Sequence, residues 1–549
     1  MRCQKGSRKP VIICLFVLGL AVCQILQAED LMYSLEELGC TECNAYQLDF
    51  LYLVKLLQDS HPNVYANFPK EDFNQEKARL LKEFETIDDL GTYALRLQQF
   101  CARMSDLHTA IGYYNVLRRT DLSIFPIALT VLQDEFYLTN FDMIIDPEWL
   151  GAKIIEVNDL PMSQVAQKLG ELASCENDVC RNHNVGYFLR EPQILEFMRI
   201  IRKGEPLTLS VETLEGVKQT LIISANARTE VEWIDLARKH HAVTVPIRKP
   251  FSYTILPEHR LCYFQFNEFF DRQALKFLSL YMGKKEFTQR FGSNPKKLYQ
   301  VPDLQKFLSR MFADLQQQQI DCLVIDLRNN SGGNSLLGIQ IMYYLQDFPE
   351  MVKGYAEGIK FSLLMQHQYP DLFDEEKQRY EDHYGEDTLS PPMYVGDLSE
   401  YREVASPHTR TYRYSQFFRI LQGQEPKLSM FAMELPKTKF AGKIFILIGT
   451  ETASSASDFA TTLSDNRLAI LIGQPIRQKP TSFGDMLFFQ LPHTSINGHV
   501  SYKIFYRPDA AKDDDPTLYP DIEVWPTIDD IMNGRDPVFD KVLELIEQE

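Results

Sequence analysis

The chain has 549 residues, of which 45% are hydrophobic and 24% are charged, and its formal net charge is -18 at pH 7. This composition is typical of a soluble globular protein with a full core, and the length predicts two to four domains. The negative charge argues against nucleic acid or an anionic membrane surface as a partner, because both are bound through basic patches.

Residues 1–28 have the pattern of a secretory signal peptide or an N-terminal anchor. Basic residues precede an uncharged apolar run at 11–22, which is shorter than a membrane-spanning helix requires. The small residue expected two positions before Ala28 is missing, so both cleavage and an N-terminal membrane tether stay open. The sequence therefore predicts an extracytoplasmic protein, whether periplasmic, cell-surface or secreted.

Seven cysteines follow this leader, and an odd number spread over a long chain argues against a dense disulfide framework. Cys175 and Cys180 lie in a polar stretch and could pair. Cys262 and Cys322 lie in apolar strand patterns, which predicts buried thiols.

Cys40 and Cys43 have the spacing of a metal or redox pair. No second pair and no nearby histidine completes such a site. The sequence therefore predicts no metal and no cofactor.

Residues 29–115 are predicted to form an N-terminal helical domain. Phe50, Leu53, Val54 and Leu57 have the i, i+3, i+4, i+7 spacing of one apolar helix face, and two more periodic segments follow at 71–85 and 88–104.

Residues 116–250 are predicted to form a strand segment followed by a small mixed unit. Apolar runs of strand length fill 123–140, and a strand at 152–157 leads into a helix at 162–173. A helical stretch at 191–202 precedes a hairpin of strands at 207–212 and 218–223.

Residues 251–549 alternate between strand and helix patterns, which predicts a layered α/β core with a largely parallel sheet. A polar, aromatic-rich insertion at about 350–435 has no clear period and could be a lid or a substrate wall. The predicted strands are 261–266, 321–326, 443–448 and 468–472, and the predicted helices are 301–316, 336–345 and 457–463.

The most informative stretch is 449–459, where the strand at 443–448 runs through a turn of small residues into a helix. This layout places a serine hydroxyl at a helix N-terminus, where free N–H groups favour negative charge. A nucleophilic serine needs such a setting, because its attack creates an oxyanion. The alternative is an ordinary serine helix cap.

The stretch 326–334 follows a buried strand and precedes a helix. Its Gly332 and Gly333 let the backbone approach a ligand and offer N–H groups. With the N–H of Ala456 they could form an oxyanion hole, and the alternative is a tight strand-to-helix turn. The glycine and lysine spacing of a phosphate-binding loop is missing.

Two residues are candidates for the general base that would activate the serine. Burial of Lys479 would bring its pKa toward neutrality, so that it could accept the serine proton. His108 lies two residues after Asp106 at a bend, and an imidazole titrates near neutral pH. Each residue also has a plain structural reading, as a solvated surface lysine or a core histidine.

Together these elements resemble the tail-specific, or carboxy-terminal processing, serine peptidase family over most of the chain after the leader. The resemblance rests on the stretches 326–333, 453–458, 106–109 and 519–524, in the family's order, and on a lysine 24 residues after Ser455. It implies an exported endopeptidase that acts on peptide or protein substrates through Ser455, with Lys479 as general base. It also implies a catalytic core of the ClpP/crotonase type, with a PDZ-like unit within 116–250.

The sequence also departs from the family pattern. Gln478 and Pro480 replace the glycines that flank the family's lysine, and Asp458 replaces a glutamate. A related branch uses serine, histidine and glutamate, which would make His108 the base, with an acid at 513–515. A catalytically inactive relative that binds peptides or hydrophobic ligands is the third hypothesis. The oligomeric state is not predicted.

Overall fold

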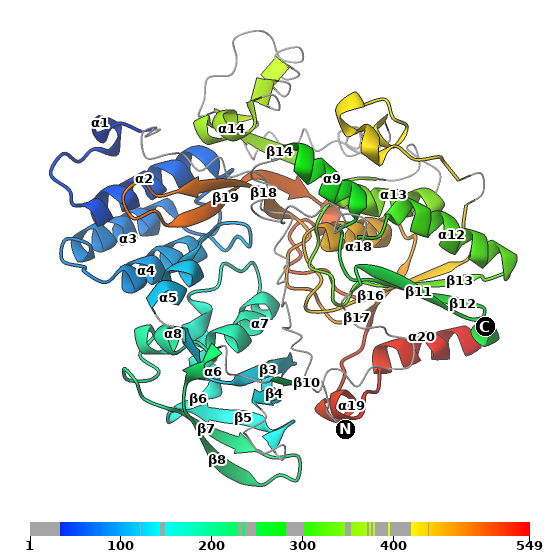
Figure 1. Cartoon of the computed structure of the whole chain (residues 1–549), viewed down its shortest axis with the longest axis horizontal. Coiled ribbons are helices and arrows are strands. Elements are labelled where there is room, and N and C mark those ends of the chain that lie inside the picture. Colours follow the sequence, from blue (N-terminus) through cyan, green and yellow to red (C-terminus); the bar gives the residue numbers. More distant parts are fainter. Residues whose placement is uncertain are drawn as a thin grey trace, which may run out of the picture.

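The chain is described from a computed structural model (Figure 1). The residues that the structure describes are 33–120, 122–142, 149–228, 233–235, 249–281, 301–345, 353–370, 373–374, 377–378, 393–395, 419–436 and 439–548. The predicted leader at 1–28 and most of the predicted insertion lie outside these ranges.

The N-terminal part is helical, as the sequence predicts. Asn44 and Asp89 cap two of the helices through their side chains, and each accepts a hydrogen bond from the backbone three residues on. Phe50, Leu53 and Leu57 are fully buried, which confirms the predicted apolar face. The helices are α1 (Leu35–Leu38), α2 (Ala45–Ser60), α3 (Lys70–Glu83), α4 (Leu90–Ala102) and α5 (Tyr113–Thr120).

The next unit is a seven-stranded sheet of order β10-β4-β5-β7-β8, with β3 on β4 and β6 on β5. The predicted hairpin around Gly216 is confirmed as β7 and β8, and α7 is a helix that the sequence analysis missed. The strands are β3 (Ile127–Leu132), β4 (Glu135–Asp142), β5 (Lys153–Val157), β6 (Leu160–Pro161), β7 (Leu207–Glu212), β8 (Lys218–Ile223) and β10 (Trp233–Asp235), and the helices are α6 (Met162–Gly170), α7 (Asp178–Phe188) and α8 (Pro192–Phe197). A separate two-stranded pair joins β2 (Ser123–Ile124) to β9 (Asn226–Ala227).

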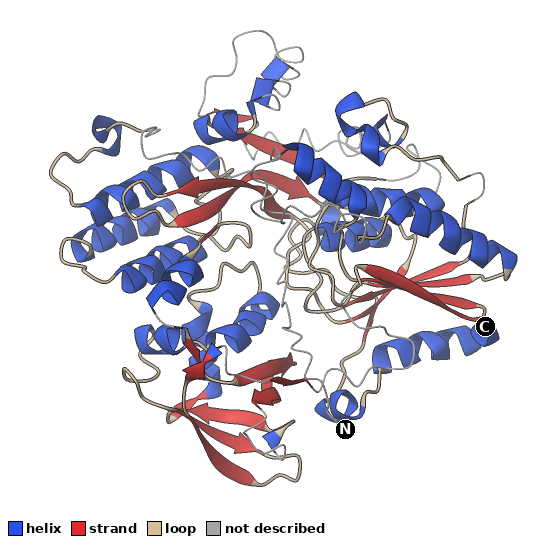
Figure 2. Cartoon of the chain, viewed as in Figure 1, coloured by secondary structure: helices blue, strands red, loops and turns tan. Residues whose placement is uncertain are grey.

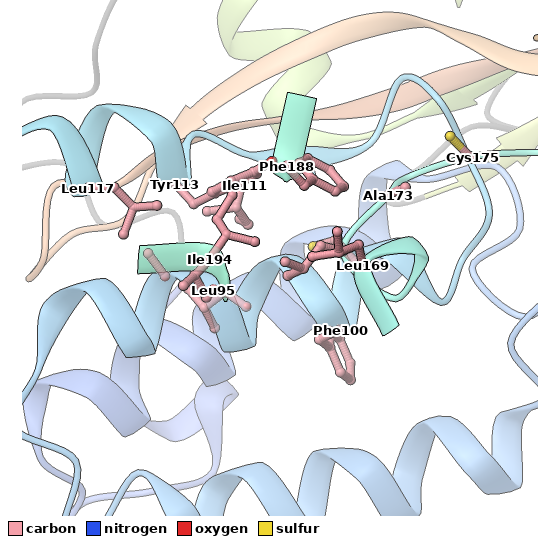
Figure 3. Close-up of a cluster of buried hydrophobic side chains, with 14 of the residues drawn as sticks. Leu95, Phe100, Ile111, Tyr113, Leu117, Leu169, Ala173, Cys175, Phe188 and Ile194 are labelled. Atoms are coloured by element: carbon pink, nitrogen blue, oxygen red, sulfur yellow. The ribbon is translucent and has the colours of Figure 1, made fainter. Parts of the chain in front are cut away.

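The side chains of α6, α7 and α8 share one hydrophobic core with α4 of the N-terminal helices, as Figure 3 shows for Leu95, Leu169, Phe188 and Ile194. This shared core fixes the mixed unit against the helical region.

The α/β core is a six-stranded sheet of order β11-β12-β13-β16-β17-β20, parallel except for the β11–β12 pair. This confirms the predicted layered α/β fold, with helices on both sides of the sheet (Figures 1 and 2). The strands are β11 (Phe251–Leu256), β12 (Leu261–Phe266), β13 (Cys322–Asp326), β16 (Lys443–Ile448), β17 (Ile470–Gly473) and β20 (Ile522–Glu523), and the helices are α9 (Arg272–Tyr281), α12 (Leu304–Gln317), α13 (Ser335–Leu345), α18 (Ser455–Asp465), α19 (Ile528–Asn533) and α20 (Pro537–Glu547).

Alternate side chains of the central strands enter two different cores. Phe264 and Ile325 pack under α12, α13 and α18, whereas Tyr263 and Val324 pack on α20. Strands buried on both faces have continuous apolar sequences, which is why the sequence analysis could predict them.

A five-stranded antiparallel sheet joins distant parts of the chain. Its order is β1-β19-β14-β15, with β18 on β19. Figure 1 labels β14, β18 and β19 of this sheet. The pairing of β1 with β19 brings the segment after α4 against the C-terminal part of the chain. The strands are β1 (Ala110–Ile111), β14 (Ala356–Phe361), β15 (Met393–Val395), β18 (Ser482–Gln490) and β19 (Asn497–Tyr506), and α14 (Leu363–Gln368) follows β14.

Two disulfides close short loops, Cys40–Cys43 and Cys175–Cys180. The second pairing is the one that the sequence left possible, and the first accounts for the spacing that resembled a metal pair. Cys262 and Cys322 are buried free thiols, as predicted. Within the described ranges, no helix has the length and apolarity needed to cross a membrane.

Candidate active site

Ser455 is the first residue of α18, directly after the turn that follows β16. The predicted helix began two residues later. Ser454 has a φ of 52°, a conformation that costs energy for a residue other than glycine and that is typical of functional turns. The Ser455 side chain is buried, with 4% of the residue exposed. The turn therefore holds one hydroxyl at a helix start inside the protein.

The Ser455 hydroxyl contacts the loop that carries Gly332 and Gly333. Its Oγ donates a hydrogen bond to the carbonyl of Gly333 at 2.6 Å and lies 2.8 Å from the Oγ of Ser335. Because the single hydroxyl hydrogen goes to the carbonyl, Ser335 must donate to Ser455. Ser335 starts α13, so the first residues of two helices meet at this point.

Parallel pairing explains why these two loops meet. Asp326, the last residue of β13, lies opposite Leu447 near the end of β16. Both strands run in the same direction, so the loops after them leave from one edge of the sheet. The loop after β13 is further fixed by Asn330, whose side chain donates to the Phe266 carbonyl at 2.7 Å and accepts from the Gly332 N–H at 2.9 Å.

The three predicted oxyanion donors differ in what they contact. The N–H of Gly332 donates to Asn330, and the N–H of Ala456 donates to the Ala453 carbonyl at 3.1 Å. No described residue accepts a hydrogen bond from the N–H of Gly333. Among the three predicted donors, the N–H of Gly333 is therefore the one available to a ligand. The carbonyl of the same residue accepts the hydrogen bond from the Ser455 hydroxyl.

Gly332 has a φ of 102° and lies against the serine turn. A Cβ built on it would be 2.6 Å from the Ser454 Cβ and 2.8 Å from the Ala453 carbonyl oxygen. We therefore expect Gly332→Ala to lower the free energy of unfolding by about 1–3 kcal/mol and to reduce any activity of the site.

Thermal and urea denaturation measure this loss. Gly204→Ala is the matched control, because Gly204 also has a positive φ, of 72°, but nothing lies within 4 Å of its added Cβ. If both variants lose the same stability, the close approach of the two loops is not what requires glycine at 332.

Asp326 and Arg328, at the start of the same motif, have a structural role. Arg328 donates to Asp326 at 2.8 Å and to Asp536 at 2.7 Å, where Asp536 caps α20. Tyr263 also donates its hydroxyl to Asp326. This network fastens the C-terminal helix under the sheet and leaves the glycines to face Ser455.

His108 lies between α4 and β1 and is partly buried. Its Nδ1 lies 3.1 Å from the carbonyl of Phe483 in β18. A carbonyl only accepts, so Nδ1 carries the hydrogen, and in the neutral ring Nε2 is the nitrogen with a free lone pair. No described residue makes a hydrogen bond to Nε2, which leaves it able to accept a proton.

The buried side chain of Asp106 fixes the backbone of His108 through a hydrogen bond. One carboxylate oxygen accepts the His108 N–H at 2.9 Å, and the other accepts from His61 Nε2 at 3.1 Å and from the Thr109 hydroxyl at 2.5 Å. Burial of Asp106 opposes its charge, but these hydrogen bonds and the nearby histidines hold its pKa well below the usual range. The predicted Asp-x-His-Thr motif is thus a rigid frame for one imidazole.

Lys479 is partly buried, and its backbone N–H donates to Glu176 Oε2 at 2.8 Å. Its neighbour Gln478, which replaces a glycine of the family pattern, is buried and accepts a hydrogen bond from the N–H of Ser454. Gln478 also donates to the Ser482 hydroxyl at 3.0 Å. In the described residues the contact with the serine turn is therefore made by Gln478 and not by Lys479.

The acid candidates at 513–515 contact other groups. Asp513 accepts from Thr481 at 2.7 Å, and Asp515 accepts from Arg507 at 2.9 Å. Besides Asp106, the carboxylate of Glu176 lies near His108, and the sequence did not point to it. Ligand atoms of Asp106, His108 and Glu176 lie within 4.8 Å of one another, so these three residues are the described group that could hold a metal ion.

Comparison with known proteins gives a family for the core. Residues 289–524 match the model of peptidase family S41, and no curated protein sequence matches the chain. The structure of mature CPAF has 16% identity and a TM-score of 0.58, and the match covers 92% of this chain and 97% of that chain.

Two further solved structures are similar. For mature CPAF complexed with lactacystin the identity is 15% and the TM-score 0.57, with 92% of this chain and 98% of that chain covered. For the photosystem II D1 C-terminal processing protease the identity is 13% and the TM-score 0.39, with 90% of this chain and 99% of that chain covered.

At such identities the likeness to mature CPAF shows a shared fold, which agrees with the α/β core predicted from the sequence. The family match lies on the segment that carries both glycine and serine motifs. Residues 289–524 are therefore similar to peptidase family S41, a family of serine-type peptidases.

Proposed function

We propose that this protein is an exported serine endopeptidase in which the Ser455 hydroxyl attacks the peptide carbonyl and forms an acyl-enzyme. The observation that carries the proposal is the meeting of Ser455 with the loop of Gly332 and Gly333, at 2.6 Å from the Gly333 carbonyl. Nucleophile and backbone donors must lie this close for one carbonyl carbon to be attacked while its oxygen is stabilised.

The contacts describe a resting arrangement of this site. The Ser455 hydroxyl is donated to a carbonyl, and the N–H groups of Gly332 and Ala456 have partners. A bound substrate would have to take the place of the Gly333 carbonyl as the neighbour of Ser455. Rotation of the peptide between Gly333 and Asn334 would free the hydroxyl, because that carbonyl is its hydrogen-bond acceptor.

His108 has better support as general base than Lys479. Its ring is held by the Phe483 carbonyl in the tautomer that leaves Nε2 able to accept the serine proton, and Asp106 fixes its backbone. Lys479 has no such contact in the described residues. Its backbone N–H donates to Glu176, and it is Gln478 that accepts a hydrogen bond from the serine turn, from the N–H of Ser454. Lys479 remains the alternative base.

Export is supported by the predicted leader and by the two disulfides. Disulfides persist in oxidising compartments and are rare in the cytosol. The partners that follow from the proposal are unfolded peptide or protein substrates, which enter the site as extended chains.

The proposal is tested with the purified full chain and an unfolded protein as substrate. We expect hydrolysis that a serine-reactive fluorophosphonate abolishes and that a chelator such as EDTA leaves unchanged, because no metal takes part in the acyl transfer. Loss of hydrolysis with EDTA and insensitivity to the fluorophosphonate would contradict a serine mechanism.

A further inference from the structure

The loop closed by the Cys175–Cys180 disulfide joins α6 to α7 and reaches the catalytic core. Asn177 in this loop caps α7, since its Oδ1 accepts from the N–H of Cys180 at 3.0 Å. Its Nδ2 donates to the carbonyl of Ile476 at 3.1 Å and to that of Pro516 at 3.0 Å. The loop is therefore attached at the start of the segment that carries Gln478 and Lys479.

Glu176, the preceding residue, contacts both segments that carry the candidate bases. Its Oε2 accepts the N–H of Lys479 at 2.8 Å, and the backbone of Leu107 lies close enough to its carboxylate to lower its pKa. Its carboxylate lies within 4.8 Å of a ring nitrogen of His108. One side chain thus lies against both 107–108 and 478–479, two stretches that are about 370 residues apart in the sequence.

The second of these stretches leads directly to the nucleophile. Gln478 accepts from the N–H of Ser454, the residue before Ser455. Its amide nitrogen donates to Ser482 at 3.0 Å, and the next residue, Phe483, supplies the carbonyl that fixes His108. A displacement of 478–483 would therefore move both the serine turn and the imidazole.

The inner side of the loop is anchored in the hydrophobic core. Cys175 and Cys180 are buried, and Figure 3 shows Cys175 at the edge of the cluster that contains Ala173 and Phe188. Asn184 of α7 donates to the Cys180 carbonyl at 2.9 Å. The disulfide is thus a rigid base from which Glu176 and Asn177 reach the core.

The carboxylate is held where its charge is unfavourable. Burial and the negative charge of Asp106 raise the pKa of Glu176 well above its usual value, and the N–H groups of Lys479 and Leu107 oppose this rise only in part. The other oxygen, Oε1, is buried without a hydrogen-bond partner in the described residues. A buried carboxylate oxygen without a hydrogen-bond partner costs stability, so a role in the site explains this residue better than a structural one.

We propose that Glu176 is a positioning residue of the peptidase site, which holds the His108 and Lys479 segments together, and that the Cys175–Cys180 disulfide keeps it in place. We call the contacts of Glu176 with the two segments the clamp. The effect of the clamp on catalysis rests on the proposed function, whereas the clamp itself is a property of the folded chain. Small displacements of a base or nucleophile lower the rate more than they lower substrate binding.

The first test replaces Glu176 in the full chain. We expect Glu176→Ala to lower kcat by about 10- to 100-fold with KM changed less than about threefold. Glu176→Gln keeps an oxygen that can accept the Lys479 N–H and should recover activity to within about fivefold of wild type. Asp178→Asn is the control, because this carboxylate lies two residues on, is 83% exposed and pairs with Arg181.

Equal loss in Glu176→Gln and Glu176→Ala would overturn the positioning role, as would unchanged kcat in Glu176→Ala. Thermal denaturation of each variant shows whether a lost activity reflects a lost fold.

The second test uses the two disulfides of the chain as a matched pair. Replacing Cys175 and Cys180 with serine should lower kcat in the same way as Glu176→Ala, whereas replacing Cys40 and Cys43 should not, because that loop lies before α2, away from the site. Equal effects of the two double variants on kcat would contradict the proposal.

Hydrogen–deuterium exchange separates the clamp from the proposed function. In Glu176→Ala the backbone amides of Leu107 and Lys479 should exchange faster than in wild type. In Asp178→Asn the same two amides should exchange at the wild-type rate. This result in a protein without peptidase activity would support the clamp and reject the proposed function. Unchanged exchange at both amides would overturn the clamp whatever the activity.

Discussion

Ser455→Ala is expected to lower peptide hydrolysis by at least about 10³-fold, with the fold unchanged. The hydroxyl is the group that would form the acyl-enzyme, and its removal leaves only substrate binding and backbone donors to stabilise the transition state. Folding should be retained because alanine fits the first turn of a helix and the lost hydroxyl bonds lie at one buried point.

Ser454→Ala is the matched control for this change. Ser454 is the neighbouring residue, and its side chain makes no helix-capping hydrogen bond. We expect its activity to stay within about threefold of wild type, since only the backbone of Ser454 contacts Gln478. The reverse result, with activity lost in Ser454→Ala and kept in Ser455→Ala, would move the nucleophile by one residue.

His108→Ala is expected to lower kcat/KM by about 10²- to 10⁴-fold, the range that a general base contributes. The reason is the imidazole tautomer that the Phe483 carbonyl imposes, which leaves Nε2 to take the serine proton. Lys479→Met should cost less than about tenfold, because its main-chain bond to Glu176 does not depend on the side chain.

His493→Ala is the control for the histidine change. His493 is exposed, and it is the backbone N–H of this residue that bonds to Asp49, so the imidazole can be removed without disturbing that contact. Steady-state kinetics with one peptide substrate give kcat/KM for His108→Ala, Lys479→Met and His493→Ala. If Lys479→Met abolishes activity and His108→Ala retains it, the mechanism uses a serine–lysine pair.

Most of the α/β core could be predicted from the sequence because its signals are local. The strands β12, β13 and β16 are buried on both faces and have continuous apolar sequences, and the predicted ranges match them within one residue. The meeting of Ser455 with Gly332 and Gly333 could also be predicted, because both motifs follow parallel strands.

The antiparallel sheet around β19 was missed because its pairing is not local. Its partner β1 is two residues long, which no periodic pattern shows, and the two are joined across nearly 390 residues. The same sheet brings Phe483 to His108, so the tautomer of the candidate base could not be predicted.

Glu176 was missed for a related reason. It lies in a polar loop, and its hydrogen bond to Lys479 spans 303 residues. The signal in the sequence was the pair of cysteines on either side of it, which predicted a closed loop but not what the loop contacts. Gln478 was noted only as a departure from the family pattern, and its bond to Ser454 depends on the fold.

The identity of the nucleophile is tested most directly by mapping the adduct of a fluorophosphonate on the folded, full-length protein by mass spectrometry. We expect one modified residue, Ser455, with the adduct retained in Ser454→Ala and absent in Ser455→Ala. An adduct at another serine, or no adduct on protein that hydrolyses peptides, would contradict the account.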